Sequence, residues 1–559
     1  MRSAYRGVVV LLVVASLLLS ACGPAPTPQV VRETVVVTKE VPKEVVVTKE
    51  VLKEVPKEVV VTREVVKEVV KVVEATPVPI SGVPVIVLDG EPASMNAIVA
   101  RARVDWTVAD EINCFLALYD EQWNLVPQAA ESWDFVDDTT VRFKIRQGIK
   151  FHNGTELTAE DVAFSILAHL DPEQGSADRT VMEPIIDRVE VEDAATVTVY
   201  LKRPYAPLMD MLISPNHPIL PKSEYSTPQS HKEDAVGCGP FMFKEWRKNA
   251  YIDLVAFPDY FEEGYPKVDG LRFTFLPEYG AAKSSLLAKE ADAILMLNLV
   301  DVPAMARMPG IKVDSVLLMG FWYVGVDMSK EPYDNPKVRT ALRLAMDRKP
   351  FLSSVLNGFG DEAFIPVPKD SPFYVPEVEY EQDIEKAKAL LAEAGYPNGF
   401  KTTLTVPKTP EEEPMGVVWQ SQLKAIGVTA ELEVLDVPTY IDRIFNKVDF
   451  EMMICGTTAG PDPQAITGRF YPSDAARNLW KYSNPVVDEN IRKAGATFDV
   501  EERKGYLRTV YTHVVEDAPM IWIARGERAS AYWDHLDGFV NKPDLRYEFW
   551  KLYYVKPKK

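Results

Sequence analysis

Residues 32–74 repeat a short pattern of valine, lysine and glutamate and contain no aromatic side chain. The unit at residues 35–41 recurs at residues 45–51, and again at residues 59–65 with arginine in place of lysine. A segment with so little apolar volume cannot bury a core of its own. The folded body of the chain is therefore expected to begin after the repeat and after residues 76–79, Thr-Pro-Val-Pro, whose prolines end regular structure.

Two conformations suit the repeat, and the sequence leaves both open. In an extended chain the basic side chains between residues 39 and 71 occupy odd positions and the glutamates even ones, so opposite charges face opposite sides. As a helix, the apolar residues follow the three–four spacing of a coiled-coil seam, although Pro42 and Pro56 oppose a continuous helix. Either form makes residues 22–79 a stalk, in which the repeat at residues 32–74 spans roughly 65 Å as a helix or roughly 140 Å when extended.

The first 22 residues have the parts of a secretory signal. Arg2 and Arg6 precede an apolar stretch at residues 8–19, which is too short to span the hydrocarbon core of a membrane. Residues 19–22, Leu-Ser-Ala-Cys, resemble a bacterial lipobox. This resemblance implies that residues 1–21 are a signal peptide and that Cys22 is lipidated. The lipid would hold the body on the extracytoplasmic face of the cell membrane, in a periplasm or at the cell surface.

The charge and the reactive residues exclude several classes of protein. The 559 residues, enough for several domains, carry a net charge of −20, which argues against a nucleic-acid partner. No run of 18 apolar residues follows the signal, so a polytopic membrane protein is excluded. The six histidines include no pair four residues apart, so we expect no metal site and no cofactor. Beyond Cys22, the cysteines Cys114, Cys238 and Cys455 allow at most one disulfide.

From residue 84 onward, predicted strands alternate with predicted helices, as in α/β or α+β folds. Residues 133–135 and 140–145 predict a hairpin around a turn at residues 137–138. A further turn at residues 153–154 leads into a helix with Thr158 as its N-cap and two acidic residues in its first turn.

The stretch at residues 143–162 resembles the signature of the family 5 extracytoplasmic solute-binding proteins, the peptide- and nickel-binding class that serves ATP-driven importers. Other motifs similar to those of the family stand in its order along the body. They lie at residues 125–133, 236–241, 257–269, 337–348, 394–397, 461–463 and 484–488. Each motif alone is weak, but their shared order makes coincidence a poor explanation.

The resemblance implies a periplasmic-binding-protein type II-like α/β fold, with two hinged lobes around a cleft and an extra domain. By motif order, lobe one comprises residues 80–111, 196–320 and 518–559, the extra domain residues 112–195, and lobe two residues 321–517. A protein of this kind closes its lobes on a small-molecule ligand and passes it, chemically unchanged, to the permease subunits of an ABC transporter. We expect it to act as a monomer.

A loop of lobe two gives the first indication of the ligand. In peptide-binding members of the family, an aspartate three residues before an Asp-Pro pair binds the amine of the peptide. Here Ala459 stands at that position, and Gly456 replaces an aromatic residue. Asp462 is a candidate substitute, although an aspartate before a proline is typical of a structural turn. With Thr457 and Thr458, the loop suits a neutral, hydroxyl-rich ligand, so we expect an oligosaccharide, with a peptide as the other choice.

Sites for sugars stack the sugar faces on aromatic rings, which makes six aromatic residues candidates. Trp522, near the expected crossing back into lobe one, is the first of them, and Trp322 and Tyr323 at the opposite crossing come next. The remaining candidates are Trp106, Trp419 and Trp480.

Two other classes of protein stay open as alternatives. A secreted hydrolase such as a glycosidase would need a pair of carboxylates, and 82 acidic residues supply such pairs by chance. The sequence has no Gly-x-Ser-x-Gly, His-Glu-x-x-His or phosphate-loop motif. A surface adhesion or scaffold protein would need little beyond the stalk. The ordered motifs favour the binding protein over both.

Overall fold

The structure is a computed structural model that describes residues 82–558, apart from residues 101, 121–122, 177, 459, 476 and 545. All described residues belong to one compact unit, residues 77–559. The predicted signal peptide, the lipidated Cys22 and the repeat lie outside the described residues. Within the described part of the chain, no helix has the length and apolar character needed to cross a membrane.

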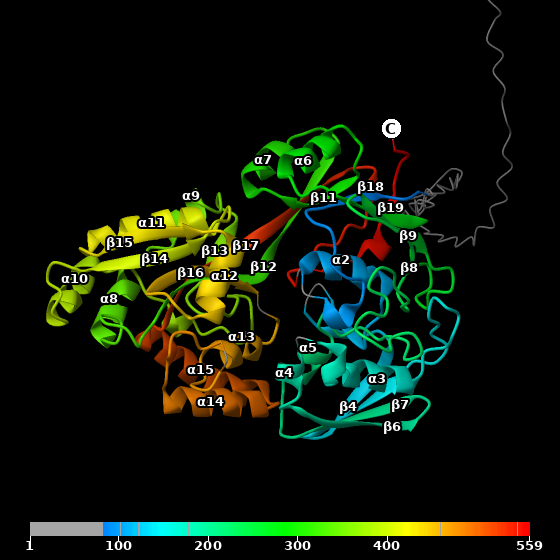
Figure 1. Cartoon of the computed structure of the whole chain (residues 1–559), viewed down its shortest axis with the longest axis horizontal. Helices are drawn as coiled ribbons and strands as arrows, with labels where there is room; N and C mark the ends of the chain where they lie inside the picture. Colours follow the sequence, from blue (N-terminus) through cyan, green and yellow to red (C-terminus); the bar gives the residue numbers. More distant parts are fainter. Residues whose placement is uncertain are drawn as a thin grey trace, which may run out of the picture. The chain divides into compact units, whose positions relative to one another are not determined.

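The backbone of the body is a mixed sheet of eleven described strands, shared by two lobes (Figure 1). Lobe two contributes its outer strands, lobe one contributes the opposite end, and β13 (Gly360–Glu362) pairs with β17 alongside this path. The strand order is β15 (Thr429–Leu435), β14 (Lys401–Pro407), β16 (Met452–Thr458), β12 (Ile311–Val326), β17 (Met520–Trp533), β11 (Ala293–Leu297), β1 (Val85–Leu88), β10 (Gly270–Phe275), β9 (Tyr251–Ala256) and β8 (Phe241–Arg247).

The two long antiparallel strands β12 and β17 connect the lobes. Their register is interrupted between the pair Leu317–Glu527 and the pair Phe321–Arg525. On one side of this interruption the strands pack into the cores of lobe two, and on the other side into those of lobe one. An irregular stretch between two regular ladders is a natural place for a hinge.

This register corrects one expected domain boundary. The chain was expected to re-enter lobe one at residue 518. However, Met520, Trp522 and Ile523 pack in the cores of lobe two, and the residues that pack in lobe one begin at Ala529. The crossing on β17 therefore lies after Gly526.

Helices cover the sheet of lobe two on both sides. Their first turns follow the capping rules, since Asn484 and Asp499 accept hydrogen bonds from backbone N–H groups at the starts of α14 and α15. The helix α15 ends at Ala518 in the left-handed conformation. The helices are α8 (Pro336–Ala345), α9 (Lys349–Ser354), α10 (Ile384–Glu393), α11 (Glu412–Ala425), α12 (Val437–Ile441), α13 (Gln464–Phe470), α14 (Pro485–Ala496) and α15 (Val500–Asp517).

Lobe one has fewer helices and is closed by the C-terminal segment. Its elements outside the main sheet are α2 (Arg103–Ile112), α6 (Tyr279–Leu287), α7 (Val302–Met305), β18 (Leu536–Asp537) and β19 (Tyr553–Tyr554). Tyr547, Phe549 and Trp550 of the C-terminal segment are buried with the strands of this lobe. Lobe one is therefore completed only by the last residues of the chain.

The extra domain is a four-stranded antiparallel sheet with helices on one face. The strand order is β4 (Ala130–Asp137), β5 (Thr140–Ile145), β7 (Thr196–Leu201) and β6 (Ile186–Asp193). The helices are α3 (Ala159–Ala168), α4 (Arg179–Met182) and α5 (Leu208–Leu212). A separate pair is formed by β2 (Ala117–Tyr119) and β3 (Leu125–Pro127). The predicted hairpin is confirmed by β4 and β5. The predicted N-cap is also confirmed, since the backbone N–H of Thr158 donates to Asp161 Oδ2 at 2.9 Å.

The extra domain is larger than expected. The boundary at residue 196 falls one strand too early, because β7 pairs between β5 and β6. Its core continues through α5 to Ile219 and includes Cys238. Cys114 and Cys238 form a disulfide, while Cys455, the other cysteine in the described part, is a free thiol.

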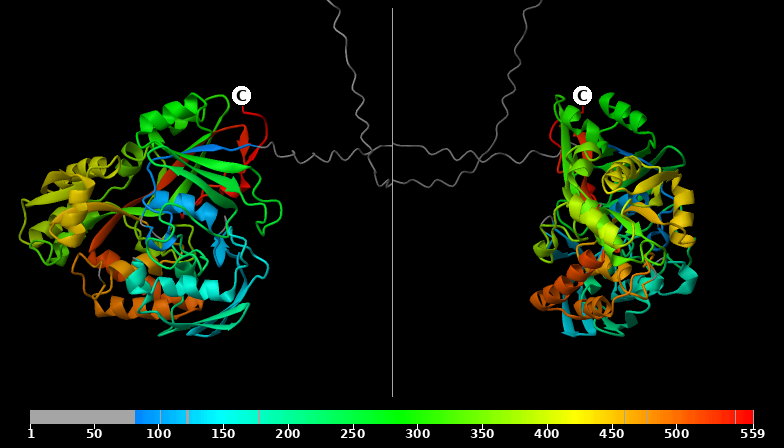
Figure 2. Two further views of the ribbon diagram at one scale, coloured as in Figure 1. Left: turned by 45° about the vertical axis from the view of Figure 1, so that its right-hand side comes forward. Right: turned by 90° about the vertical axis from the view of Figure 1, so that its left-hand side faces the viewer.

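The extra domain meets lobe two directly, and both views of Figure 2 show α14 and α15 beside it. The N–H of Ala206 donates to the carbonyl of Gly495 at 2.8 Å. The rings of Phe135 and Phe498 lie 4.9 Å apart between centroids. These contacts close the body on one side of the crossing strands.

Candidate ligand-binding site

A cavity of about 270 Å³ lies in lobe two, beside the crossing strands. Its walls come from β12, β16, α12, the π-helical segment Asp442–Asn446 and α13. It is lined by Tyr323, Ile441, Phe445, Asn446, Gly456, Thr457, Arg469, Phe470 and Arg477. Its size is close to the lower limit for small-molecule sites, and it combines aromatic side chains with a few polar groups.

The pairing of β12 with β16 brings three of the predicted residues to this cavity. In the antiparallel register Tyr323 faces Cys455 and Phe321 faces Thr457. Because side chains alternate along a strand, Tyr323 and Trp322 point to opposite faces of the sheet. Tyr323, Gly456 and Thr457 therefore line the cavity, and Trp322 does not.

Trp322 instead contacts the loop from the face of the sheet opposite the cavity. Its Nε1–H and the N–H of Gly456 both donate to Glu412 Oε1, each at 3.2 Å. A Cβ at Gly456 would lie 3.0 Å from that carboxylate oxygen and 3.1 Å from Trp322 Nε1. A side chain at this position would need Glu412 or Trp322 to move by a few tenths of an ångström, so the glycine has a packing role independent of any ligand.

Two arginines in the cavity wall distinguish this site. Arg469, on α13, is open to solvent in the cavity, and Arg477 is half-buried. Among the described residues, neither guanidinium forms an ion pair with a carboxylate. Their planar groups lie instead over the rings of Phe470 and Phe445, at 5.5 Å and 5.1 Å from the ring centroids.

The surroundings of Arg469 favour an anionic guest. Desolvation by the surrounding protein lowers the pKa of Arg469, and the like charge of Arg477 lowers it further. Asp178 of the extra domain is among the charges that act on Arg469, so this wall faces the extra domain. Within the described residues neither guanidinium is held in an ion pair, and such a group at a cavity wall suits a carboxylate or another planar anion.

Asp462 forms a buried ion pair with Arg503, which neutralises the charge of its carboxylate. Both carboxylate oxygens accept hydrogen bonds from the guanidinium of Arg503, and both side chains are largely buried. The backbone N–H of Asp462 donates to Asp210 Oδ2 at 2.8 Å, and the hydroxyl of Tyr119 donates to Oδ1 of Asp210. This chain of bonds joins α15, the loop of lobe two and the extra domain.

The same network leaves Asp462 without a free charge for an amine. Burial and the nearby Asp462 raise the pKa of Asp210 to about 7. The predicted substitution of Asp462 for the amine-binding aspartate is therefore not available in this arrangement. Ala459 lies outside the described residues, and Thr458 is exposed next to it.

Three of the predicted aromatic residues are core residues of lobe two. Trp522 is 2% exposed, and its indole N–H donates to the hydroxyl of Tyr471 at 2.9 Å. Trp480 and Trp419 are fully buried, and their N–H groups bond to the Phe470 carbonyl and to Met452 Sδ. None of the three presents a ring face to the cavity, because the strands and helices that carry them turn these positions inward.

Trp106, the remaining aromatic candidate, is half-buried on α2 of lobe one and does not line the cavity. The structure thus brings together Tyr323, Gly456 and Thr457. It adds residues that the sequence did not indicate, namely Ile441, Phe445, Asn446, Arg469, Phe470 and Arg477.

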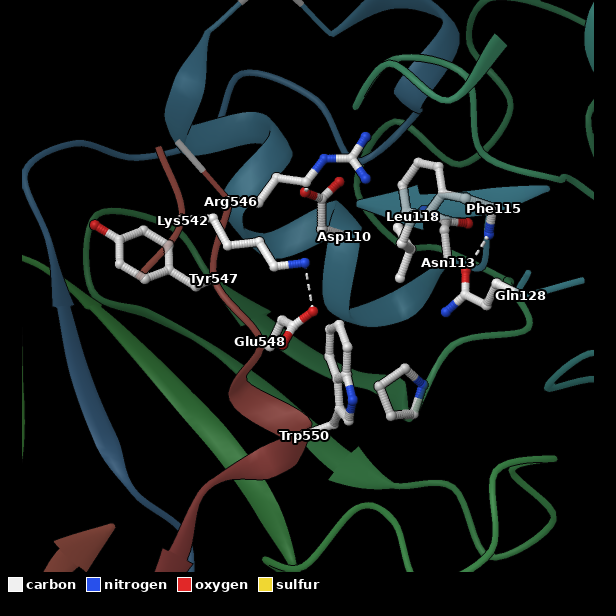
Figure 3. A pocket seen from close by; sticks show the side chains of 11 residues that line it. Asp110, Asn113, Phe115, Leu118, Gln128, Lys542, Arg546, Tyr547, Glu548 and Trp550 are labelled. Atoms are coloured by element: carbon white, nitrogen blue, oxygen red, sulfur yellow. Dashed lines mark hydrogen bonds and ion pairs between the residues drawn. The ribbon is translucent and has the colours of Figure 1, made fainter. Parts of the chain in front are cut away.

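A smaller cavity of about 10 Å³ lies in lobe one between α2 and the C-terminal segment (Figure 3). Lys542 Nζ contacts Glu548 at 2.5 Å, and Arg546 Nε lies 3.7 Å from Asp110. Burial raises the pKa of Asp110 to about 7. The cavity has room for about one water molecule, so it is part of a buried polar network and too small for a ligand.

The fold and the lobe-two cavity define a two-lobed solute-binding protein, in which two strands link α/β lobes around a ligand site. Residues 124–478 match the model of the bacterial extracellular solute-binding proteins, family 5, and the chain belongs to this family. The match covers the loop and both arginines of the cavity.

Relatives of known type resemble the chain over most of its length. The oligopeptide-binding protein AppA of Bacillus subtilis is 29% identical over 494 residues, which cover 81% of this chain and 88% of AppA. The glutathione-binding protein GsiB of Pectobacterium atrosepticum is 26% identical over 489 residues, which cover 85% of this chain and 95% of GsiB. The ABC transporter-associated periplasmic binding protein DppA of Helicobacter pylori, solved with the peptide STSA, is 25% identical in sequence, with a TM-score of 0.74. The structural match covers 86% of this chain and 99% of the DppA chain.

Proteins of this class bind a solute outside the cytoplasm and deliver it to an ABC transporter. These relatives are named for binding, and they give no support to the alternative of a hydrolase.

Proposed function

We propose that this chain captures a small peptide-like solute that carries a carboxylate and delivers it to the permease subunits of an ABC importer. The observation that carries the choice of ligand is the pair Arg469 and Arg477, which line the cavity and form no ion pair within the described residues. A carboxylate accepts two parallel hydrogen bonds from a guanidinium, which gives both affinity and orientation.

The relatives support a ligand of this class. AppA and GsiB are named for oligopeptide and glutathione, and the DppA structure contains a tetrapeptide. With alanine at position 459 and Asp462 occupied by Arg503, the amine end of a peptide has no ionic partner in this loop. Recognition therefore shifts towards the carboxylate end.

The oligosaccharide expected from the loop composition has less support. Its stacking partners Trp522, Trp480 and Trp419 are buried, and a neutral ligand would form no ion pair with the two guanidinium groups that line the cavity. A carboxylate would pair with these groups through charge-assisted hydrogen bonds, which a neutral sugar cannot supply.

The ligand proposal is tested with Arg469→Ala and Arg477→Ala, titrated calorimetrically with a tetrapeptide library. Each substitution is expected to weaken binding about 10- to 100-fold, since one charge-assisted hydrogen bond contributes about 1.5–3 kcal/mol. Amidation of the peptide C-terminus should weaken binding to the unchanged protein by a similar factor.

Arg508→Ala serves as the matched control, because Arg508 is exposed on α15 and, in the part of the chain that the structure describes, forms an ion pair with Glu377 alone, at 3.5 Å. Equal affinity for free and amidated peptides, in protein that retains both arginines, would remove the carboxylate from the proposal.

The site of action is proposed from the sequence before the body. A lipid on Cys22 would hold the protein at the membrane, with residues 22–79 as the stalk and the body acting as a monomer. We expect Cys22→Ser to move the protein from the membrane fraction to the soluble fraction after cell fractionation. Unchanged membrane association of that variant would refute the anchor.

A further inference from the structure

A cluster of three potential metal ligands lies in the extra domain, outside the cavity described above. His169 follows the end of α3, Asp178 precedes α4, and His217 follows α5. One ligand atom from each lies within 4.8 Å of the other two. The two histidines are buried, while Asp178 is partly open to solvent and provides a route of entry.

The hydrogen bonds of His217 leave one nitrogen facing an acceptor. Its Nδ1 contacts the backbone carbonyl of Met211, which can only accept, so Nδ1 carries the hydrogen. Its Nε2 lies 3.2 Å from Asp178 Oδ2. A lone pair and a carboxylate oxygen at this distance need a cation between them, either a proton or a metal ion.

The ring of His169 lies directly against that of His217. The two rings meet edge to face with centroids 4.2 Å apart. One ring nitrogen of His169 lies within 4.8 Å of the ligand atoms of Asp178 and His217. Its Nδ1 lies 2.8 Å from the hydroxyl of Ser176, which also accepts the N–H of Asp178 at 3.2 Å.

Asn216 adds an independent observation beside the cluster. Its side-chain N–H donates to Asp178 Oδ2 at 3.0 Å, while its Oδ1 is buried without a hydrogen-bond partner. The two ends of an amide are assigned from their bonds, so a turned amide would present Oδ1 towards Asp178. A cation at this point would satisfy an acceptor that is otherwise unpaired.

We propose that His169, Asp178 and His217 bind one divalent transition-metal ion, with zinc as the first choice, and that Asn216 or a water supplies the fourth ligand. Two imidazole nitrogens and one carboxylate are a common ligand set for zinc. Zinc bonds of about 2.1 Å separate neighbouring ligand atoms by about 3.4 Å. The 3.2 Å separation of His217 Nε2 and Asp178 Oδ2 fits this geometry, and the ligand atom of His169 lies within 4.8 Å of both.

The hydrogen bond from Nδ1 of His217 to the backbone carbonyl of Met211 is also typical of a metal-binding histidine. Metal-binding histidines donate their other ring N–H to a carbonyl or a carboxylate, which fixes the ring orientation. The ion would tie together the end of α3, the start of α4 and the segment after α5, three parts of the extra domain that no disulfide joins to each other within the described residues.

The test is a calorimetric titration of the full chain with Zn²⁺ alone, after treatment with EDTA. We expect one equivalent to bind and to raise the melting temperature. His169→Ala, His217→Ala and the isosteric Asp178→Asn should each reduce zinc affinity at least about 10-fold, and Asn216→Ala should reduce it about 10-fold or less. Co²⁺ should give the visible absorption of a four-coordinate site, and this absorption should be absent in the variants.

His513→Gln is the matched control, because His513 is a half-buried histidine on α15 that bonds to the Thr509 carbonyl and belongs to no such cluster. Circular dichroism identifies the variants that remain folded. Failure of the unchanged protein to bind zinc, or equal affinity in folded Asp178→Asn, would overturn the proposal.

Discussion

Replacing Arg503 with alanine is expected to lower the free energy of unfolding by about 3–5 kcal/mol, because it leaves a buried carboxylate without its partner. Arg503 holds both oxygens of Asp462 and donates its Nε–H to the Ala494 carbonyl at 2.8 Å. The loss follows from the desolvated charge of Asp462 more than from the missing attraction. Urea denaturation of the purified body measures it.

The same helix provides the control. Arg508→Ala removes an exposed ion pair with Glu377 and should change stability by less than about 1 kcal/mol. A double variant, Asp462→Leu with Arg503→Met, removes both charges and should be more stable than Arg503→Ala alone. Equal stability of Arg503→Ala and the Arg508→Ala control would contradict this interpretation.

The second large effect is expected from the disulfide between Cys114 and Cys238. These residues are 124 positions apart and fully buried in the core of the extra domain. Closing so long a loop restricts the unfolded chain, and the expected stabilisation is about 4–5 kcal/mol. Replacing both cysteines with alanine, or reducing the protein, should remove this stabilisation, measured as a fall in the urea midpoint.

Cys455 gives the matched comparison for the disulfide. Burial raises the pKa of its thiol to about 12, so it is unreactive near neutral pH. Cys455→Ser should leave the response to reductant unchanged. A midpoint that is insensitive to reductant in the unchanged protein would show that the disulfide contributes nothing.

Local features of the fold were predictable from the sequence. The hairpin of β4 and β5, the capping of α3 by Thr158 and the family itself follow from residues that are close together in the chain. Turn and cap signals act over a few residues, so one sequence is enough to find them.

The domain boundaries and the site depend on contacts that a single sequence does not contain. Strand β7 was expected in lobe one, yet its partners β5 and β6 lie in the extra domain. Trp522 was expected at the cleft because it lies near the crossing, but its inward position on β17 was decided by pairing with β12. Proximity along the chain to a crossing strand does not determine which face a side chain takes.

The charged residues were the least predictable part. Arg469 and Arg477 lie on a short helix and the loop after it, and nothing local marks them as neighbours of Tyr323. The absence of histidines four residues apart predicted no metal site. That rule considers ligands on one helix, whereas the ligands proposed above, His169, Asp178 and His217, belong to three segments and fall outside it.

The central claim is that this body binds a solute and releases it unchanged. Native mass spectrometry of the purified chain, incubated with the tetrapeptide library and then denatured, tests this claim directly. We predict one peptide per protein, and released peptides with the masses that were added. Peptides recovered as fragments, or a folded protein that retains no library member at any concentration tried, would contradict it.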